Sequence, residues 1–510
     1  MSLLKRTPLL LGLLGFLPTA ASAGQYQNFN AAVYVRAYEV QLMKDPAWLR
    51  DNWAIVERQV KVDKVYLETH RDLIIVDDAT LQQAKAFFQA KGIVVAGGIA
   101  TVRNESNLFE VFCYTQAGQR AKMREIVEAT ARNFDEFIID DFFFTSCTCD
   151  ECIAAKGDRS WTRFRLDLMK EVSRDLILKT AHTVNPKVKV TLKYPNWYEH
   201  YQGTGYNLED EPPLYDKIYT GTETRDPVHT GQHLQPYHSY EAFRYLENIK
   251  PGGNGGGWVD SGARGNADRY AEQFWLTMFA KAPEITLFAM NELLMPFGER
   301  DRASWQGQGT SFDYAKAQAR CAGSPAMKPT LAAVAGQALE LADSVVGKLG
   351  KPIGLVAYKP FHSTGEDFIH NFLGMVGLPI EMVPQFPVDA PHGAVDRERE
   401  ARPCHCRQDQ GAVARRQERG DHHGPATGAA RPRHRGYRRD RSLRAARAGA
   451  AVRAARTDRN GGGAHRAARG ALPDQRVVGD HLHTRQRRRP PGAAHARLQQ
   501  GQALRTHRSG

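Results

Sequence analysis

The chain has 510 residues, too many for one ordinary hydrophobic core, so we expect a barrel-sized domain and at least one further domain. Its net charge of +13 would suit a nucleic-acid or acidic-membrane partner if it were evenly spread. However, the segment from Arg397 to Gly510 holds 28 Arg, no Lys and 9 Asp plus Glu, which leaves −6 for the rest of the chain. The globular part is therefore mildly acidic, and we expect no nucleic-acid partner.

The first 23 residues have the pattern of an export signal. Two basic residues precede an apolar run from Leu9 to Leu17, and Ala21-Ser22-Ala23 supplies the small residues that a signal peptidase needs. The alternative is a membrane anchor, but the run is well short of the roughly 20 apolar residues that a span requires. We predict a signal peptide over 1–23, a secreted or periplasmic protein, and no membrane association after cleavage.

Eight short apolar runs alternate with amphipathic stretches and are rich in β-branched or aromatic residues, as buried parallel strands are. They are Ala32–Tyr38, Val65–Leu67, Ile93–Ile99, Phe137–Phe144, Val188–Tyr194, Lys217–Gly221, Gly257–Asp260 and Ile285–Met290. The segments with a helical pattern are Asp51–Val60, Leu81–Ala90, Gln119–Ala131, Trp161–Thr183 and Ala267–Ala282. This order predicts a (β/α)8 barrel over 24–325. A doubly wound open sheet is the alternative, although no Gly-rich phosphate loop follows the first run.

A second α/β unit is predicted over 326–392. After a helical stretch at Leu331–Lys348, the pattern gives a strand at Lys351–Tyr358, a helix at Thr364–Gly374 and a strand at Ile380–Val383. This is the opening of a flavodoxin-like layer that is not completed.

The segment 393–510 has a different composition. It contains no Lys, Ile, Met, Phe or Trp, a single Tyr, and dense Arg, Ala, Gly, Pro and His. Such a chain cannot bury enough apolar surface to offset its ordering entropy, so we predict disorder. We favour the product of a frameshift in a GC-rich gene over a genuine Arg-rich arm, which would more often contain Lys and aromatic residues for stacking.

Acidic residues stand at the ends of several predicted strands, where a (β/α)8 barrel has its active site. Glycosidic cleavage needs one carboxyl group to protonate the leaving oxygen and a second to act as nucleophile or to activate water. Asp141 is the first candidate, because it follows a strongly apolar run. Glu223 and Asp260 are equal candidates for its partner. Asp140 is also a candidate, although on an ideal strand it would point toward the helices.

Other side chains near these strand ends are predicted to bind sugar. Flat aromatic rings stack on pyranose faces, and charged groups bind hydroxyls. The set is Glu68, His70, Lys193, Tyr194, Trp197, Arg225, Trp258 and Glu292. Two alternatives stay open, in which the acids only pair with Arg225, His70 or Lys193, or the rings only pack on the barrel rim. No organic cofactor is expected.

Four cysteines are predicted to come together. Cys147, Cys149 and Cys152 follow the fourth strand, and Cys113 follows the third. Four thiols from neighbouring loops fit a closed tetrahedral zinc site of the structural kind. Two disulfides are the alternative in an exported protein, but the tight spacing makes strain-free pairing difficult.

With these cysteines, and with the segment Tyr358–Ser363, the sequence resembles the family-42 β-galactosidases of the glycoside hydrolases over roughly Ala32–Pro387. The resemblance implies a (β/α)8 barrel, a four-cysteine zinc site, a trimerisation-like domain of flavodoxin type, and hence a homotrimer. That family places Asn-Glu at the end of strand four, with this Glu as acid/base, and a Glu nucleophile at strand seven. Here Asp140-Asp141 and Asp260 stand in those places, and Asp is about one methylene shorter than Glu.

The resemblance therefore implies an exported glycoside hydrolase that acts on an oligo- or polysaccharide, but it does not imply a β-galactosidase. A different division of roles stays open, with Asp141 on strand four and Glu223 on strand six, as in α-glycosidase barrels. The rival hypothesis is a carbohydrate-binding barrel without catalysis.

Overall fold

In the computed structural model the described residues are 25–196, 201–226, 228, 230, 234–260, 266–304, 312–321, 328–363 and 368–387. The predicted signal peptide over 1–23 and the predicted tail over 393–510 lie outside these ranges, as does Trp197. Among the described helices, none has both the length and the apolar character needed to cross a bilayer.

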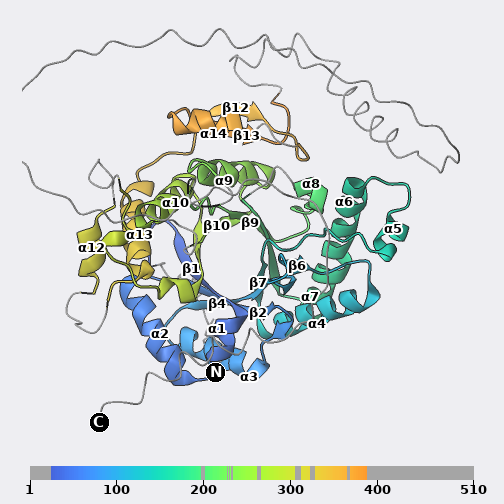
Figure 1. Cartoon of the computed structure of the whole chain (residues 1–510), viewed down its shortest axis with the longest axis horizontal. Helices are drawn as coiled ribbons and strands as arrows, with labels where there is room; N and C mark the ends of the chain where they lie inside the picture. The colour runs from blue at the N-terminus through green and yellow to red at the C-terminus, as the bar shows by residue number, and fades with distance from the viewer. Residues whose placement is uncertain are drawn as a thin grey trace, which may run out of the picture. The chain divides into compact units, whose positions relative to one another are not determined.

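Eight parallel strands form a closed barrel (Figure 1). They are β1 (Asn30–Val35), β2 (Lys64–Arg71), β4 (Val94–Ile99), β7 (Glu136–Ile139), β8 (Lys189–Tyr194), β9 (Lys217–Gly221), β10 (Asn254–Asp260) and β11 (Glu284–Phe288). The barrel closes at β1, in which Val33 pairs with Leu287 of β11 and with Val65 of β2. The predicted (β/α)8 barrel is confirmed, and the open sheet is wrong.

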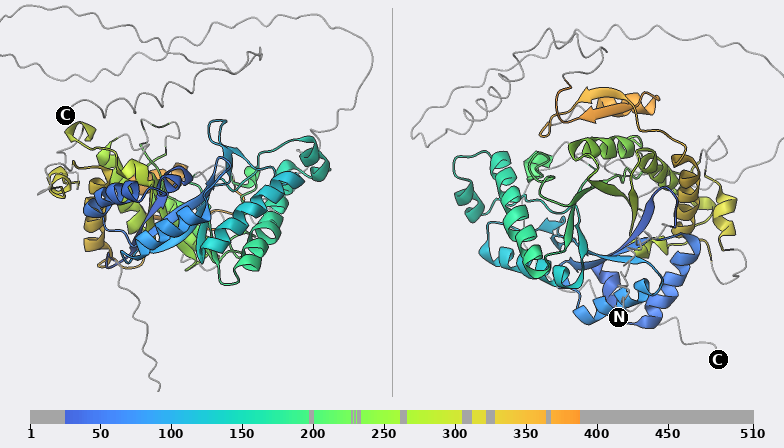
Figure 2. Two further views of the ribbon diagram at one scale, coloured as in Figure 1. Left: turned by 90° about the horizontal axis from the view of Figure 1, so that it is seen from below. Right: turned by 180° about the vertical axis from the view of Figure 1, so that it is seen from behind.

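Helices surround the strands (Figure 2). They are α1 (Ala37–Leu42), α2 (Pro46–Gln59), α3 (Asp78–Gln89), α4 (Ala117–Asn133), α5 (Asp150–Lys156), α6 (Trp161–Glu171), a π-helical segment (Val172–Leu178), α7 (Lys179–Val184), α8 (Tyr201–Thr204), α9 (His238–Ile249), α10 (Ala267–Phe279), α11 (Met290–Leu293), a 3₁₀ turn (Glu299–Asp301), α12 (Tyr314–Ala319) and α13 (Leu331–Val346). Asp45 and Asp77 cap α2 and α3 by accepting bonds from first-turn N–H groups. Their apolar faces meet where Trp53 packs edge-on against Phe88, with ring centroids 4.8 Å apart.

The interior of the barrel is a packed core. Because side chains alternate along a strand, Tyr34 of β1 points inward while its neighbours Val33 and Val35 join the layer under the helices. Gly98 makes room for this tyrosine, since a Cβ atom at Gly98 would lie 2.6 Å from the Tyr34 hydroxyl oxygen. The inward side chains are Ala32, Tyr34, Tyr66, Ala96, Ile138, Tyr219 and Trp258.

Two short antiparallel strand pairs lie beside the barrel strands. The strand β3 (Ile74–Ile75) pairs with the end of β2, and a hairpin of β5 (Val102–Asn104) and β6 (Glu110–Val111) follows β4. The hairpin is not among the predicted elements, and it contributes to the candidate site described below.

The helix α13 belongs to the barrel. Nε1 of Trp275 in α10 donates to the carbonyl oxygen of Ala338 at 3.1 Å. Most of the buried apolar side chains of α13 pack in the same layer as Val33 and Val35 of β1, between the strands and the helices. This helix, which the prediction assigned to the second unit, therefore packs with the barrel, and the boundary between 325 and 326 stays a prediction.

The small unit that follows contains β12 (Leu355–Tyr358), α14 (Phe368–Met375) and β13 (Ile380–Val383), with the two strands paired in parallel. It contacts α9 of the barrel, where Arg244 Nε donates to Glu381 at 3.1 Å and the Tyr237 hydroxyl accepts from Ile380 N at 3.0 Å. The β-α-β order agrees with the predicted strands and helix, and the flavodoxin-like type stays a prediction.

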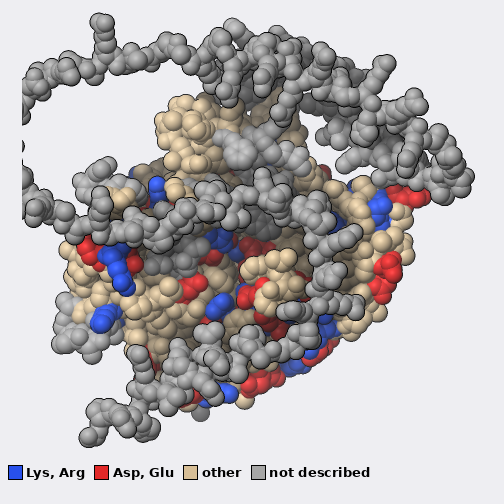
Figure 3. Space-filling view, viewed as in Figure 1, with Lys and Arg blue, Asp and Glu red and all other residues tan. Residues whose placement is uncertain are grey.

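The described surface carries both charges. In Figure 3, Lys and Arg are interspersed with Asp and Glu over the described part of the face shown. The excess of Arg lies between Arg397 and Gly510, outside the described residues. The expectation of no nucleic-acid partner remains a prediction.

Candidate active site

A cavity of about 540 Å³ lies at the C-terminal ends of the barrel strands. Its walls carry several acidic and basic side chains together with aromatic rings. The described lining residues are Arg36, Arg71, Glu105, Phe109, Asp140, Asp141, Phe142, Lys193, Glu223, Arg225, Trp258, Asp260 and Phe288. This is the position that a (β/α)8 barrel uses for its active site.

Lys193 is the centre of the cavity floor. Its Nζ atom lies 2.8 Å from Asp141 Oδ2, 3.2 Å from Asp140 Oδ1 and 3.4 Å from Glu223 Oε1. The same ammonium group lies 4.3 Å from the centroid of the Trp258 ring. Only 2% of the Lys193 side chain is exposed, so one buried cation joins the adjacent pair Asp140 and Asp141 to the distant Glu223.

The contacts to Lys193 limit the distance between the two principal acids. Because Asp141 and Glu223 both contact the same nitrogen, their contacting oxygens are at most about 6.2 Å apart, closer than the upper limit of roughly 9.5 Å for glycosidase acid pairs. The geometric condition for the predicted pair is therefore met.

Local backbone geometry explains why Asp140 and Asp141 both reach the cavity. The strand β7 ends at Ile139, before the predicted end at Phe144. Asp140 N then donates to Ile99 O, and Asp140 Oδ1 accepts from Asp141 N, each at 2.9 Å. The chain has left the strand at this point, so strict alternation no longer directs the two side chains to opposite faces.

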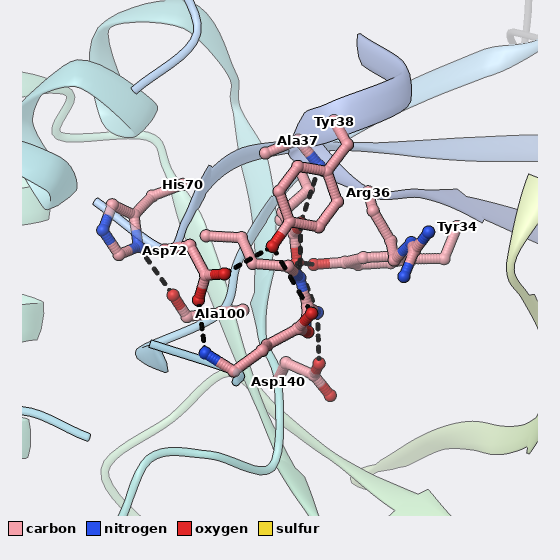
Figure 4. A network of polar contacts seen from close by, with 12 residues as sticks. Tyr34, Arg36, Ala37, Tyr38, His70, Asp72, Ala100 and Asp140 are labelled. Carbon is pink, nitrogen blue, oxygen red and sulfur yellow. Dashed lines mark hydrogen bonds and ion pairs between the residues drawn. The ribbon is translucent and has the colours of Figure 1, made fainter. Parts of the chain in front are cut away.

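Asp140 is connected to a buried network (Figure 4). Arg71 Nη2 lies 3.1 Å from Asp140 Oδ2 and 2.8 Å from Glu68 Oε1. The remaining acceptors of Glu68 are used by the Tyr34 hydroxyl and the Ala37 N–H, both at 2.7 Å. Glu68 therefore fixes Arg71, and it does not line the cavity as the predicted sugar-binding role would require.

The acids have different proton affinities. Burial raises the pKa of Asp141 to about 7, and the charges of Asp140 and Glu223 act in the same direction against Lys193. Burial also disfavours the charged form of Asp140, but Lys193 and Arg71 outweigh it and hold the pKa of Asp140 below its ordinary value. The pKa of Glu223 is raised by burial. Near neutral pH, Asp140 is thus ionised while Asp141 can carry a proton.

One carboxylate oxygen of Glu223 makes no contact with Lys193 or with any other hydrogen-bond donor among the described residues. This oxygen, Oε2, is buried. Gly221 makes space for it, since a Cβ atom at Gly221 would lie 2.8 Å from this oxygen. Burying a carboxylate oxygen without a hydrogen-bond partner costs folding free energy, so this carboxylate is a candidate for a functional group.

Asp260 is held differently. Its Oδ2 atom accepts from Arg225 Nη2 at 2.6 Å and from Arg225 Nε at 3.1 Å. Arg225 is itself fixed through its backbone N–H, which donates to Gln273 Oε1 at 3.0 Å. Asp260 is therefore paired with Arg225, and both members of this ion pair line the cavity.

The family described as "Probable glycosyl hydrolase, catalytic domain" matches residues 19–348, which include the whole barrel. The chain belongs to this family. The predicted enzyme class, a glycoside hydrolase, is confirmed at this level. The match covers α13 and ends before the small β12–α14–β13 unit.

One relative of this glycosyl hydrolase is the uncharacterized protein SSO3021 of Saccharolobus solfataricus, 29% identical over 306 residues, 53% of this chain and 50% of the relative. The chain thus spans about half the length of this relative. Similar solved structures include a GH5_18 variant from Streptomyces cattleya in complex with Manb1-4GlcNAc (12% identity, 70% of this chain, 94% of that chain, TM-score 0.45). Another is GH5_18 from Bifidobacterium longum subsp. longum (12% identity, 70% and 92% coverage, TM-score 0.43).

Not all predicted sugar-binding residues reach the cavity of the glycosyl hydrolase. Lys193, Arg225 and Trp258 do. His70 does not, because its Nδ1 is hydrogen-bonded to Ala100 O at 2.7 Å; burial lowers the pKa of His70 to about 4. Tyr194 packs in the layer under the helices with Tyr206, at 6.0 Å between ring centroids.

Two further predicted residues have different outcomes. Glu292 lies in α11 and is not among the described lining residues, whereas Trp197 is outside the described part of the chain. Several lining residues of the glycosyl hydrolase were not among the predicted site residues. Some of them stand at strand ends and could have been found by that rule: Arg36, Arg71 and Phe288. Others depend on the unpredicted hairpin or on the turn after β7: Glu105, Phe109 and Phe142.

The four predicted metal-binding cysteines come together. The Sγ atoms of Cys113, Cys147, Cys149 and Cys152 all lie within 4.8 Å of one another. Cys113 Sγ lies 3.5 Å from Cys152 Sγ and 3.8 Å from Cys149 Sγ, far longer than the disulfide bond length of about 2.05 Å. All four are free cysteines in this structure.

Proposed function

We propose that the barrel hydrolyses glycosidic bonds in an oligo- or polysaccharide, with Asp141 as proton donor and Glu223 as the second carboxylate. One observation carries this proposal: both acids contact Nζ of the buried Lys193 in a cavity whose wall includes Trp258. Two carboxyl groups within reach of one bond are what glycosidic cleavage needs.

The division of roles follows from charge. A proton donor must be protonated at the working pH, and the pKa of about 7 suits Asp141 to this task. When the proton passes to the leaving oxygen, the new carboxylate remains 2.8 Å from the Lys193 ammonium, which stabilises it. Asp140, ionised and bound to Arg71, positions Lys193 from the other side.

The separation of the acids supports a retaining reaction. The contacting oxygens can be at most about 6.2 Å apart, which is below the roughly 6.5–9.5 Å of inverting enzymes and leaves the roughly 5–5.5 Å of retaining enzymes within reach. In this scheme a carboxylate oxygen of Glu223 attacks the anomeric carbon while Asp141 protonates the leaving oxygen. Asp141 then takes a proton from water, which attacks the same carbon and releases Glu223.

Asp260 is a weaker candidate for the nucleophile. The family-42 resemblance would give this role to its position on strand seven. Its Oδ2, however, is engaged by two nitrogens of Arg225, so an attack from it would first have to break that ion pair. We propose that Arg225 and Asp260 bind sugar hydroxyls.

The cysteine cluster is proposed to hold a structural zinc ion. In a tetrahedral site with Zn–S bonds of about 2.3 Å, neighbouring sulfurs are about 3.8 Å apart, close to the separations of Cys113 from Cys149 and Cys152. Four thiolates leave no open position for water, so such an ion would stabilise the loops after β6 and β7 and would not take part in hydrolysis.

Export, a homotrimer and a flavodoxin-like second domain are further proposals. Export is supported by the sequence pattern of 1–23, and the trimer by the family-42 resemblance. None of them affects the assignment of the acids.

The experiment that tests the proposed function is product analysis by NMR on a panel of polysaccharides, comparing the wild type with Asp141→Asn. We expect the wild type to release a product whose first-formed anomer has the configuration of the substrate, and the variant to release far less. Binding of a polysaccharide without turnover by the wild type would instead identify a carbohydrate-binding barrel.

A further inference from the structure

A second cavity of about 410 Å³ lies beside the first. The hairpin of β5 and β6 forms one side of it, and the segment after β7 forms another. Phe109, in the turn of the hairpin, lines both cavities. Both volumes lie in the range of roughly 300–1,000 Å³ that small-molecule sites occupy.

The aromatic ring of Phe109 lies between the two cavities and lines both of them. It is stacked on the ring of Phe142, with centroids 5.1 Å apart and an angle of 13° between the planes. Phe142 directly follows Asp141, the proposed proton donor. The stacked pair therefore leads from the proposed reaction centre toward the second cavity. Phe109 is 48% exposed to solvent, so its ring is accessible to a ligand.

The hairpin is built to hold this ring in place. Leu108 and Phe109 have φ values of 52° and 54°, a conformation that costs free energy for residues other than glycine. The Glu105 N–H donates to Asp72 Oδ1 at 2.7 Å, and the Glu105 carboxylate pairs with Arg71 of the buried network. The strained turn is thus held next to the proposed catalytic cavity by these two contacts. It leaves the Phe109 ring half-exposed, and folding gives no reason for this exposure.

The polar lining of the second cavity fits an uncharged, hydroxyl-rich ligand. It consists of three amides, one hydroxyl, one guanidinium and one carboxylate, beside the Cys113 and Cys147 thiols of the cysteine cluster. The guanidinium and the carboxylate neutralise each other, with Arg103 Nη1 2.6 Å from Glu110 Oε1. A phosphate or a polyanion would need an excess of cations, which this lining lacks among the described residues. The residues are Arg103, Asn107, Glu110, Gln116, Gln119 and Ser146.

We propose that the second cavity binds sugar units on the leaving-group side of the scissile bond, so that the substrate is a chain of sugars and not a small glycoside. This inference rests on the proposed function, because the proton donor must lie on the side of the leaving oxygen. Phe142 and Phe109 continue from Asp141 in that direction. Amides and aromatic rings would then hold the next sugars of the chain.

The test is calorimetric titration of the full chain carrying Asp141→Asn, so that ligands are not consumed. The probes are manno-, cello-, xylo- and galacto-oligosaccharides from the monosaccharide to the hexasaccharide. In the series that binds best, we expect affinity to rise about tenfold or more beyond the disaccharide, as stacking on an aromatic ring gives. Adding Phe109→Ala or Asn107→Ala should remove this gain. Phe279→Ala, which removes a partly exposed ring on α10, is the matched control and should keep it.

Asn107 lines only the second cavity, so its variant separates this subsite from the catalytic cavity, which Phe109 also lines. The proposal is overturned if affinity stops rising at the disaccharide in every series, or if both variants keep the full gain. Turnover by the wild type is measured in parallel on the same probes. A length-dependent affinity that the variants abolish, without any turnover, would leave the subsite standing and overturn the proposed hydrolysis.

Discussion

Oδ2 of Asp141 lies 2.8 Å from Nζ of Lys193, and both groups are buried at the floor of the same cavity. A carboxyl group in this position experiences two opposite influences. Burial favours its neutral form, and the ammonium group favours its ionised form. The balance places its pKa near 7, so the proton can leave and return during a reaction at neutral pH.

The first prediction separates the roles of the two acids. Asp141→Asn should lower kcat by about 10²- to 10⁴-fold on natural oligosaccharides, because the leaving oxygen is no longer protonated. Activity on a dinitrophenyl glycoside should fall much less, since that leaving group needs no proton. Glu223→Gln should abolish turnover of both substrates. Asp167→Asn, in an exposed ion pair on α6, is the control and should change neither rate. Asp141→Asn protein as active as its parent on oligosaccharides would remove Asp141 from the mechanism.

The second prediction concerns the pH dependence of the rate. The donor must be protonated and Glu223 must be ionised, so kcat/KM should follow a bell-shaped curve. The alkaline limb should fall with an apparent pKa near 7, which belongs to the coupled group of acids around Lys193. In Asp141→Asn measured on the dinitrophenyl glycoside, the alkaline limb should disappear. A limb that persists unchanged in this variant would assign the titration to another group.

The same pKa has a consequence for stability. Because the folded pKa of Asp141 is raised, the folded state binds this proton more tightly than the unfolded chain, whose carboxyl titrates near pH 4. The stability that it contributes is present below about pH 4 and is lost as the pH rises toward about 7. Asp141→Asn should therefore gain stability relative to the wild type over this interval. Urea unfolding of both proteins at several pH values measures this difference, and a difference that is constant with pH would contradict it.

Much of this site could be predicted from the sequence. Asp140, Asp141, Glu223 and Asp260 were found because each lies at or just beyond the end of a barrel strand. The four cysteines were found because they lie in the segments that follow two neighbouring strands, β4 and β7. In both cases the position along the chain determines the position in space, since the ends of parallel strands meet on one side of a closed barrel.

Other assignments depended on which way a side chain points. Lys193 and Tyr194 are adjacent on β8, and alternation sends the lysine into the barrel and the tyrosine under the helices. In β2 the pairing with β4 shifts register between Glu68 and His70, so alternation cannot be extrapolated along that strand. Phe109 could not be predicted either, because its turn uses left-handed Leu and Phe in place of the usual Gly or Asn.

The third prediction tests the space reserved for Glu223. Gly221→Ala would put a Cβ atom 2.8 Å from Glu223 Oε2 and 2.9 Å from the backbone nitrogen of Asn196, so something must move. We expect a stability cost of about 1–3 kcal/mol, as for other overpacked sites, and a fall in kcat of tenfold or more. Gly118→Ala at the start of α4, where a Cβ meets nothing within 4 Å, is the control and should be neutral or slightly stabilising. Wild-type kcat in Gly221→Ala would show that the position of Glu223 is not critical.

The fourth prediction assigns Glu68 to structure. Glu68→Gln removes the charge that faces Arg71 in the buried network, and breaking a buried ion pair typically costs about 3–5 kcal/mol. Thermal and urea unfolding should show this loss. The surface pair of Glu57 with Lys91 offers a control, since Glu57→Gln should change stability by no more than about 1 kcal/mol. If Glu68 bound sugar instead, Glu68→Gln would raise KM and leave the free energy of unfolding unchanged.

The last prediction concerns the cysteine cluster. If it holds a structural zinc ion, metal analysis of the purified chain should give about one zinc per molecule, and the variant Cys152→Ser should contain much less. Because the binding free energy of such an ion is part of the folding free energy, a chelator should lower the melting temperature of the wild type by several degrees. Cys321→Ser, which removes a buried cysteine outside the cluster, should keep both the metal and the response to the chelator. A metal-free protein whose melting temperature falls on treatment with a reducing agent would instead show that these cysteines form disulfides.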